Sequence, residues 1–260
     1  MIPAGMRARA VVRARGAGTL SGVAVARRIV ALGGRGVRLR AHRADGRAFR
    51  AGEAILSLEG PLRSILAIER TLLNAMGRLS GVATATADMV RRVRGTRARV
   101  RDTRKTTPGL RALEKAAVLH GGGSPHRSGL HDAFLCKDNH LAHVPAARLR
   151  QVIERGVRAA RRRGPLAFVM VEVDTERQFG QLLALPRGVL DAVLLDNMPP
   201  ATLRRLVRLR DRRAPWLKLE ASGGVTPGGI GRVARTGVDF ISCGAITHSA
   251  PQVDFGLDIG

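Results

Sequence analysis

Tyrosine is absent from this 260-residue sequence, and all aromatic residues together make up only 3% of it. Proteins that bind single-stranded nucleic acid stack the bases on aromatic rings, so this scarcity argues against that class. Acidic residues are also few: the sequence contains 20 Asp and Glu but 45 Lys and Arg, which gives a formal net charge of +25. Such a charge attracts polyanions, but 41 of the basic residues are arginines spread along nearly every segment. We therefore expect affinity for small anions and no nucleic-acid partner.

Cysteine and long apolar runs are lacking as well. Cys136 and Cys243 lie far apart in apolar runs without a CxxC spacing, which argues against a disulfide framework and against a zinc site. No stretch approaches the roughly 20 apolar residues of a membrane span, and the start MIPAGMRARA lacks the apolar centre of a signal peptide. The sequence therefore predicts a cytoplasmic protein with two reduced thiols and no membrane contact.

Short apolar runs that end in polar or glycine residues alternate with longer amphipathic stretches, and this alternation predicts a parallel β/α architecture. Residues 146–164, for example, repeat Leu, Val and Ile at helical spacing among arginines. The part from residue 98 onward spans about 160 residues, fewer than the about 250 of a complete eight-stranded barrel. We therefore expect a barrel that is open or short of a strand. Its strands are expected at residues 98–103, 133–138, 166–174, 189–197, 216–222 and 238–245.

The first 80 or so residues follow a different pattern. Strand-like runs at residues 11–20, 36–46 and 52–60 are separated by glycine turns and by an apolar helix near residues 24–32. This pattern predicts a smaller α+β domain, which is joined to the barrel through a helix that contains residues 65–79.

The polar and glycine residues at the strand ends of the expected barrel change in charge along the chain: the first strands end in cations, the middle ones in carboxylates and the last ones in glycine and serine. A single such charge is most often a solvated rim residue, but six strands that end this way point to a site, because β/α barrels carry their chemistry at the carboxyl ends of the strands. Cations suit a polycarboxylate, carboxylates suit Mg²⁺ or a developing positive charge, and glycine amides suit a phosphate. We expect one small polycarboxylate substrate and one magnesium-bound sugar phosphate. In chain order the cations are Arg104, Lys105, His126, Arg127 and Lys137, the carboxylates Glu172 and Asp196, and the last group Ser222, Gly223, Gly224 and Gly244.

Six segments closely resemble the nicotinate-nucleotide pyrophosphorylase family, also called quinolinate phosphoribosyltransferase. They are ERTLLNAMGRLSGVATAT (69–86), DTRKTTPGLRALEKAAVLHGGGSPHRSGLHDAFLCKDNH (102–140), VEVDT (171–175), LLDNM (194–198), LEASGGVT (219–226) and GVDFISCGAITHS (237–249). The resemblance implies an α/β sandwich domain over residues 1–81, an open, about seven-stranded TIM-like β/α barrel over residues 82–249, and a return of residues 250–260 to the first domain. It also implies a homodimer that converts quinolinate and phosphoribosyl pyrophosphate (PRPP) into nicotinate mononucleotide, pyrophosphate and CO₂ in NAD biosynthesis.

The resemblance further implies a role for individual residues. Arg70 resembles the arginine that reaches into the neighbouring subunit's site, and Mg²⁺ is expected to be bound mainly through PRPP. Lys105, Glu172 and Asp196 are the expected catalytic residues, the two acids facing the ribose and the metal. The remaining expected substrate contacts are Arg104, Lys105, His126, Arg127 and Lys137 on the quinolinate side, and Ser222, Gly223, Gly224, Gly244 and Ala245 in the phosphate loops.

Several neighbouring residues have a second interpretation. From sequence alone, His126 is as well explained as a loop histidine held by the backbone as by a substrate contact. Asp102 is expected to pair with Arg104 or with a helix terminus. Strand alternation directs Arg101 away from Asp102, which predicts a surface arginine. Lys218 lies inside a strand run and is expected to point into the barrel.

Two other functions compete with this hypothesis. A molybdenum-transport-associated homologue shares the fold, but the RKT, HR and KDN elements stand here in the form of the biosynthetic enzyme. A basic scaffold without catalytic activity would explain the charge but not the grading of residue types along the strand ends.

Overall fold

The computed structural model describes residues 2–3 and 5–260, and its internal contacts divide the chain into two compact units. Unit 1 comprises the described residues of Met1–Asp88, Lys105–Gly123 and Ala245–Gly260, and unit 2 comprises Met89–Arg104 and Ser124–Gly244. The expected α/β class, with a small sheet domain and an unclosed parallel β/α domain, is confirmed. Since each unit draws on more than one stretch of the chain, the expected domain limits at residues 81 and 249 stay a prediction.

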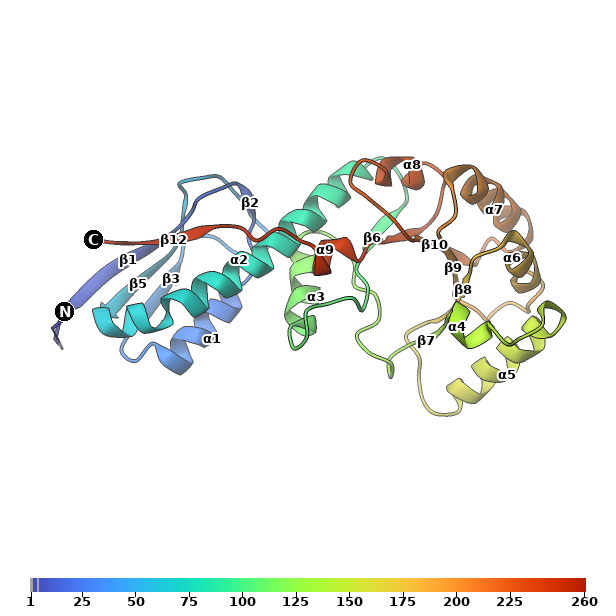
Figure 1. The fold of residues 1–260 in the computed structure, drawn as a ribbon, viewed down its shortest axis with the longest axis horizontal. Helices are drawn as coiled ribbons and strands as arrows, with labels where there is room; N and C mark the ends of the chain where they lie inside the picture. The colour runs from blue at the N-terminus through green and yellow to red at the C-terminus, as the bar shows by residue number, and fades with distance from the viewer. Residues whose placement is uncertain (1, 4) are drawn as a thin grey trace. The chain divides into compact units, whose positions relative to one another are not determined.

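Unit 1 is built on an antiparallel sheet (Figure 1). Its strands are β1 (Arg7–Ala14), β2 (Gly18–Thr19), β3 (Arg38–Ala41), β4 (Ala48–Phe49), β5 (Ala54–Pro61) and β12 (Phe255–Ile259), and its helices are α1 (Val23–Gly33), α2 (Leu62–Arg92, which continues into unit 2), α3 (Arg111–His120) and α9 (Ala245–His248). Four strands follow the order β12-β1-β5-β3. Ala10, Val12 and Ala14 of β1 are fully buried at every second position, and they share one core with Ala26 of α1 and Met76 of α2.

Unit 2 contains six parallel strands in the order β6-β11-β10-β9-β8-β7. All six strands expected from the apolar runs are confirmed, as β6 (Arg99–Arg101), β7 (Phe134–Cys136), β8 (Val169–Val173), β9 (Ala192–Asp196), β10 (Lys218–Ser222) and β11 (Phe240–Ser242). Every residue of β8 is buried, as expected for a strand whose two faces are both covered. The described residues thus form six strands where about seven were expected, and Ser124 makes only a single parallel bridge with Arg101 at the β6 edge.

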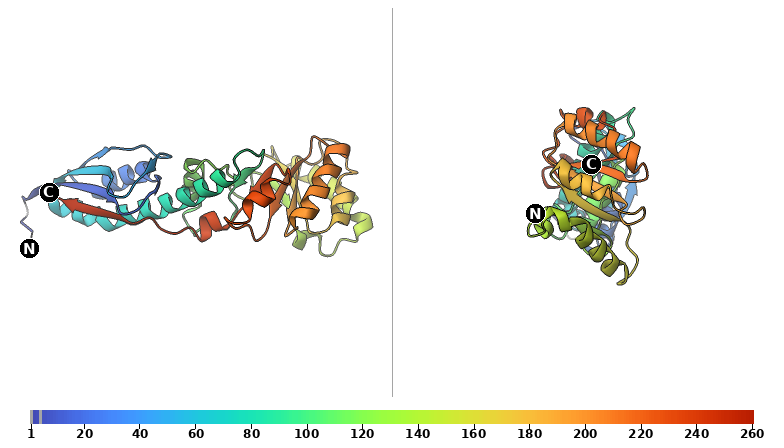
Figure 2. Two further views of the ribbon diagram at one scale, coloured as in Figure 1. Left: turned by 90° about the horizontal axis from the view of Figure 1, so that it is seen from above. Right: turned by 90° about the vertical axis from the view of Figure 1, so that its right-hand side faces the viewer.

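Helices lie on the outer side of this sheet (Figures 1 and 2). They are α4 (Asp138–Leu141), α5 (Leu149–Arg161, preceded by the 3₁₀ turn Ala146–Arg148), α6 (Glu176–Leu182), α7 (Pro200–Arg213) and α8 (Ile230–Ala234). The helix expected within residues 146–164 is confirmed as α5, which buries Leu149, Ile153 and Val157 and exposes most of its arginines. In the described part of the chain, no helix is both long enough and apolar enough to cross a membrane.

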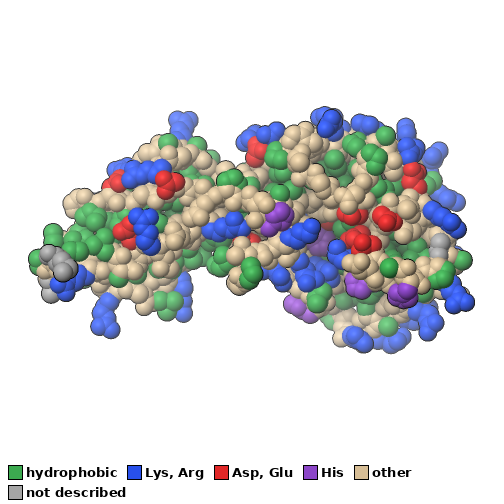
Figure 3. Space-filling model, in the orientation of Figure 1, with side chains coloured by type: hydrophobic (Ala, Val, Ile, Leu, Met, Phe, Trp, Pro, Cys, Tyr) green, Lys and Arg blue, Asp and Glu red, His purple; other side chains and the backbone are tan. Residues whose placement is uncertain are grey.

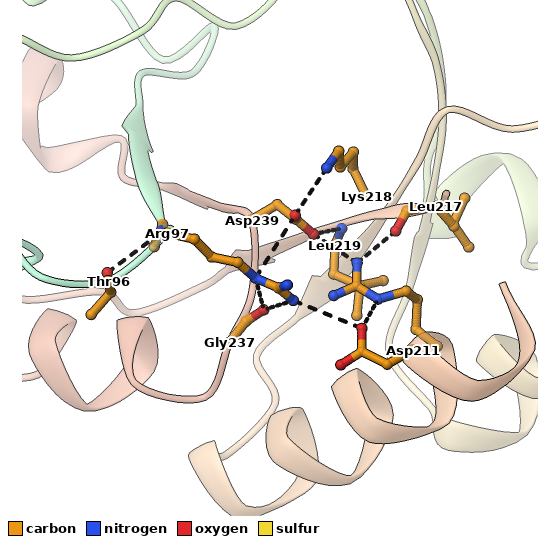
Figure 4. A network of polar contacts seen from close by, with 10 residues as sticks. Thr96, Arg97, Asp211, Leu217, Lys218, Leu219, Gly237 and Asp239 are labelled. Atoms are coloured by element: carbon orange, nitrogen blue, oxygen red, sulfur yellow. Dashed lines mark hydrogen bonds and ion pairs between the residues drawn. The ribbon is translucent and has the colours of Figure 1, made fainter. Parts of the chain in front are cut away.

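A network of ion pairs lies at the amino ends of β10 and β11 (Figure 4). The Asp239 carboxylate accepts hydrogen bonds from Arg210 Nη1 at 2.8 Å and from the Leu219 amide at 2.9 Å. Burial alone would raise the pKa of Asp239, but these bonds and the nearby cations lower it overall. Lys218, which we expected to point into the barrel, is exposed instead and pairs with Asp239 at 3.3 Å. The network fixes the end of the sheet opposite to the expected site.

Candidate active site

Ten of the expected site residues belong to unit 2, and most of them follow the carboxyl ends of its strands. Because the strands are parallel, these ends meet at one edge of the sheet. Arg70, Lys105 and Ala245 belong to unit 1, where Lys105 and Ala245 directly follow the last residues of two unit 2 segments. The ten residues of unit 2 are Arg104, His126, Arg127, Lys137, Glu172, Asp196, Ser222, Gly223, Gly224 and Gly244.

Basic side chains outside the expected site are scattered over the face of the molecule seen in Figure 3. Figure 3 shows Lys and Arg side chains spread over the visible surface of both units instead of gathered in one patch. This distribution agrees with an arginine-rich composition and gives no support to a dedicated polyanion surface. The informative cations are therefore the ones that the fold buries.

Arg127 is such a cation, since only 7% of it is exposed. Burial lowers the pKa of its guanidinium, and the charge of Arg104 lowers it further, while Asp132 and Glu172 oppose the shift. Two guanidinium groups that repel each other in a partly buried place form a site that favours an anion. The turn after Arg127 is held by Asp132, which accepts hydrogen bonds from the Ser128 amide at 2.6 Å and the Ser128 hydroxyl at 2.7 Å.

His126 is held by protein groups on both sides of its ring. Nδ1 accepts a hydrogen bond from the Arg127 amide at 2.8 Å, and Nε2 lies 3.3 Å from Glu220 Oε1. The amide of His126 donates to Oδ1 of the fully buried Asp102 at 2.6 Å. These contacts agree with a loop histidine that positions its neighbours. Its role as a substrate contact stays a prediction.

Arg101 is not the surface arginine that we expected. Its side chain is only 16% exposed, Nη1 lies 3.0 Å from Glu220 Oε2, and its guanidinium carbon lies 3.4 Å from the centroid of the Phe240 ring. Strand alternation does direct Arg101 away from Asp102, but both faces of a β/α sheet are covered. The direction opposite to Asp102 is therefore also an interior direction, and the prediction of solvent exposure was wrong.

Glu172 and Asp196 form the acidic part of the site. Burial raises the pKa of Glu172, and the charge of Asp196 also raises it, whereas the hydrogen bond and charge of Lys137 lower it. Lys137 Nζ lies 3.0 Å from Glu172 Oε2, and Asp196 accepts a hydrogen bond from the Asn197 side-chain amide at 2.7 Å. Two carboxylates that repel each other can stabilise a cation, either a metal ion or positive charge that develops on a substrate.

The loop after β10 requires glycine for two different reasons. Gly223 has a φ of +92°, and a Cβ there would lie 2.0 Å from Asn197 Oδ1, so no side chain fits. Gly224 has a φ of +57°, a left-handed conformation that glycine adopts without strain. Consecutive amides in such a loop form a concave donor surface that suits a phosphate.

Three residues at or beside the site have structural roles that the sequence did not reveal. Asn197 also adopts a positive φ of 53° and donates its amide to the Ser222 carbonyl at 2.9 Å, which links the ends of β9 and β10. A positive φ at Asn is a recognised turn signal, but the LLDNM segment alone does not reveal it. The contact between Arg101 and Glu220 was missed because the two residues lie on different strands, β6 and β10. The available signal was a carboxylate inside a strand run, at Glu220, which indicates a buried polar group that needs a partner.

Two family models together match nearly the whole chain. Residues 1–80 match the model described as "Quinolinate phosphoribosyl transferase, N-terminal domain". Residues 82–258 match the model described as "Quinolinate phosphoribosyl transferase, C-terminal domain". The second match contains all the site residues described above in unit 2.

Two relatives and one solved structure that are similar to this chain are named nicotinate-nucleotide pyrophosphorylase. The nicotinate-nucleotide pyrophosphorylase (carboxylating) of Mycobacterium leprae is 41% identical over 260 residues, which are 99% of this chain and 88% of the relative. The probable nicotinate-nucleotide pyrophosphorylase (carboxylating) of Methanothermobacter thermautotrophicus is 44% identical over 220 residues, which are 83% of this chain and 76% of the relative. The crystal structure of the nicotinate-nucleotide pyrophosphorylase of Ehrlichia chaffeensis is similar with a TM-score of 0.88 and 31% identity, covering 100% of this chain and 90% of that one.

Proposed function

This chain belongs to the quinolinate phosphoribosyl transferase family, and on that premise we propose that Arg104 and Arg127 bind the quinolinate carboxylates while Glu172 and Asp196 face the ribose of PRPP. The chain is a pentosyltransferase that makes nicotinate mononucleotide, pyrophosphate and CO₂ from quinolinate and PRPP. The observation that carries the residue assignment is the pair of neighbouring guanidiniums, one of them buried, because a dicarboxylate relieves their mutual repulsion.

The acids have a separate task in this proposal. When the bond between ribose C1 and pyrophosphate breaks, the bonding electrons leave with pyrophosphate and positive charge develops on the ribose. The carboxylates of Glu172 and Asp196 stabilise that charge while the pyridine nitrogen forms the new bond to C1. The ring nitrogen is then cationic and stabilises the electron pair that stays on the neighbouring ring carbon when the bond to the carboxylate breaks, so CO₂ leaves and that carbon takes up a proton. Lys105 is proposed to bind a quinolinate carboxylate together with Arg104.

Mg²⁺ is proposed as the cofactor. Among the described residues, no group of three or more His, Cys, Asp and Glu side chains is arranged to hold a metal ion. The chemistry of the two available carboxylates, Glu172 and Asp196, fits an ion that takes most of its oxygen ligands from PRPP. Bound there, Mg²⁺ would neutralise phosphate charge, and the amides of Gly223 and Gly224 would hold the 5′-phosphate.

A cytoplasmic homodimer is the proposed assembly. Arg70 lies on α2 with 78% of its side chain exposed, and its contact is with the preceding residue, Glu69, at 3.0 Å. An exposed arginine of this kind is able to reach an anionic site on another subunit. We propose that Arg70 completes the active site of the neighbouring subunit.

One assay tests the function directly. The purified protein is mixed with quinolinate, PRPP and Mg²⁺, and nicotinate mononucleotide and CO₂ are followed together. We expect the two products in equal amounts. When nicotinate replaces quinolinate, no CO₂ can form because the carboxylate that is lost is missing, and little nicotinate mononucleotide should form because a single carboxylate binds the pair of guanidiniums less well. A folded protein that forms neither product would contradict the proposed function.

The pH dependence tests the acidic pair. Since the pKa of Glu172 is raised, Glu172 becomes protonated and loses its negative charge at a higher pH than an ordinary glutamate. In a plot of kcat against pH, the fall of kcat on the acid side (the acid limb) should therefore lie at a pH above the usual glutamate pKa. Asp196→Asn removes a negative neighbour and should move that limb to lower pH, in addition to lowering kcat. The measurement is kcat from about pH 4 to 8, with the exposed Asp174→Asn as control, and an acid limb that stays in place in Asp196→Asn would count against the pairing.

A further inference from the structure

Glu220 is a buried carboxylate to which the proposed reaction assigns no task. It lies in the middle of β10 between the buried residues Leu219 and Ala221, and none of its surface is exposed. Burying a carboxylate is costly unless it is well paired, and an apolar side chain of similar size would often serve stability as well. A group kept in spite of this cost is a reasonable candidate for a specific function.

Two side chains from distant parts of unit 2 meet at this carboxylate. Arg101 of β6 lies 3.0 Å from Oε2, and His126 lies 3.3 Å from Oε1. Burial alone would raise the pKa of Glu220, but the contact with His126 and the charge and hydrogen bond of Arg101 lower it overall, so the group is charged. The fixed negative charge of Glu220 therefore lies next to His126, in the segment that also carries Arg127.

The contacts of the His126 ring define its tautomer. The Arg127 amide donates to Nδ1 at 2.8 Å, so Nδ1 carries a lone pair and no proton. In the neutral ring the proton is then on Nε2, which is the atom that faces Glu220. The edge-to-face contact with the Phe168 ring, at 5.2 Å between centroids, further limits the rotation of the imidazole.

We propose that Glu220 is a positioning residue for the reaction, which orients His126 and, through the Nδ1 contact with the backbone of Arg127, keeps the Arg127 guanidinium in place for a dicarboxylate substrate. Arg101 holds Glu220 from its other side. The proposal rests on the proposed function, because the occupant of the Arg127 site is taken to be quinolinate. It concerns the binding of one substrate and not the bond-breaking steps.

The kinetic test is Glu220→Gln, which keeps the size of the side chain and removes its charge. We expect the KM for quinolinate to rise by about tenfold or more, as is usual when an orienting partner is lost. The KM for PRPP and kcat should change by less than about threefold, because the PRPP groups do not contact Glu220. A quinolinate KM like that of the wild type, in an active and folded variant, would overturn the proposal.

Asp239→Asn is the matched control. Asp239 is also buried, is also paired with an arginine, and accepts a bond from the Leu219 amide next to Glu220. This variant should lower the melting temperature at least as much as Glu220→Gln while leaving the KM for quinolinate unchanged. An equal rise of that KM in both variants would show general loosening of the sheet and would also overturn the proposal.

A spectroscopic measurement needs no enzymatic activity. In the ¹⁵N-histidine-labelled wild-type protein, the ring signals of His126, identified by their loss in His126→Gln, should be those of a neutral ring with its proton on Nε2. Protonation at Nδ1 would contradict the geometry. If the wild type forms no nicotinate mononucleotide, the proposed function fails, and a comparison of this signal between the wild type and Glu220→Gln still decides whether Glu220 orients His126, because an unchanged signal would overturn that part.

Discussion

Arg104→Ala is expected to abolish quinolinate turnover and to leave the fold intact. Arg104 and the buried Arg127 are close enough for the charge of one to lower the pKa of the other, so this place favours a bound anion. A forked guanidinium–carboxylate contact contains two charge-assisted hydrogen bonds. Losing it should lower kcat/KM for quinolinate by roughly a hundredfold to ten-thousandfold, at about 1.5–3 kcal/mol for each bond. Steady-state kinetics with quinolinate as the varied substrate measure this loss.

The control for Arg104→Ala is Arg208→Ala, which removes the same charge from the exposed side of α7 in the same unit. It should leave kcat/KM unchanged, which separates a local contact from the general attraction of a very basic protein for anions. Arg104→Lys should recover only part of the activity, since an ammonium cannot form the forked contact. Activity of Arg104→Ala close to that of the wild type would show that Arg104 does not bind quinolinate.

The strands of unit 2 were predictable because their signal is local. Each is a short apolar run that ends in a polar residue or glycine, and the complete burial of β8 shows why such runs need no alternation. The amphipathic spacing of α5 is equally local, since burial of Leu149, Ile153 and Val157 follows directly from the helical period. For these elements the residues of the element itself determine both its type and its buried face.

The partners inside the site were not predictable in this way. Arg101 and His126 both contact Glu220, which lies about a hundred residues further along the chain, so no local pattern reports the contact. Alternation also tells which residues share a face but not whether that face is covered, and this is why Arg101 was wrongly placed in solvent. The resemblance to known enzymes predicts which residues touch substrate, whereas only the structure reveals the buried carboxylate of Glu220 next to His126.

Mixing two inactive variants should restore activity if Arg70 acts on the neighbouring subunit. Arg70→Ala lacks the donated arginine and Arg104→Ala lacks a residue of the barrel site, so each homodimer should be inactive. In a mixed dimer the barrel of the Arg70→Ala subunit receives Arg70 from its partner and is complete. A purified mixed dimer should have about half of the wild-type activity, because one of its two sites is complete.

The control for this experiment is a mixture of Arg104→Ala with Glu172→Gln. Both changes lie in unit 2, so neither barrel of the mixed dimer is complete and no activity should return. The variants are co-expressed with two different tags, and dimers that carry both tags are purified before the assay. If mixed dimers of Arg70→Ala and Arg104→Ala stay as inactive as the control, Arg70 acts within its own subunit or not at all. Recovery in that mixture alone would instead place Arg70, whose side chain is 78% exposed, in the active site of the other subunit.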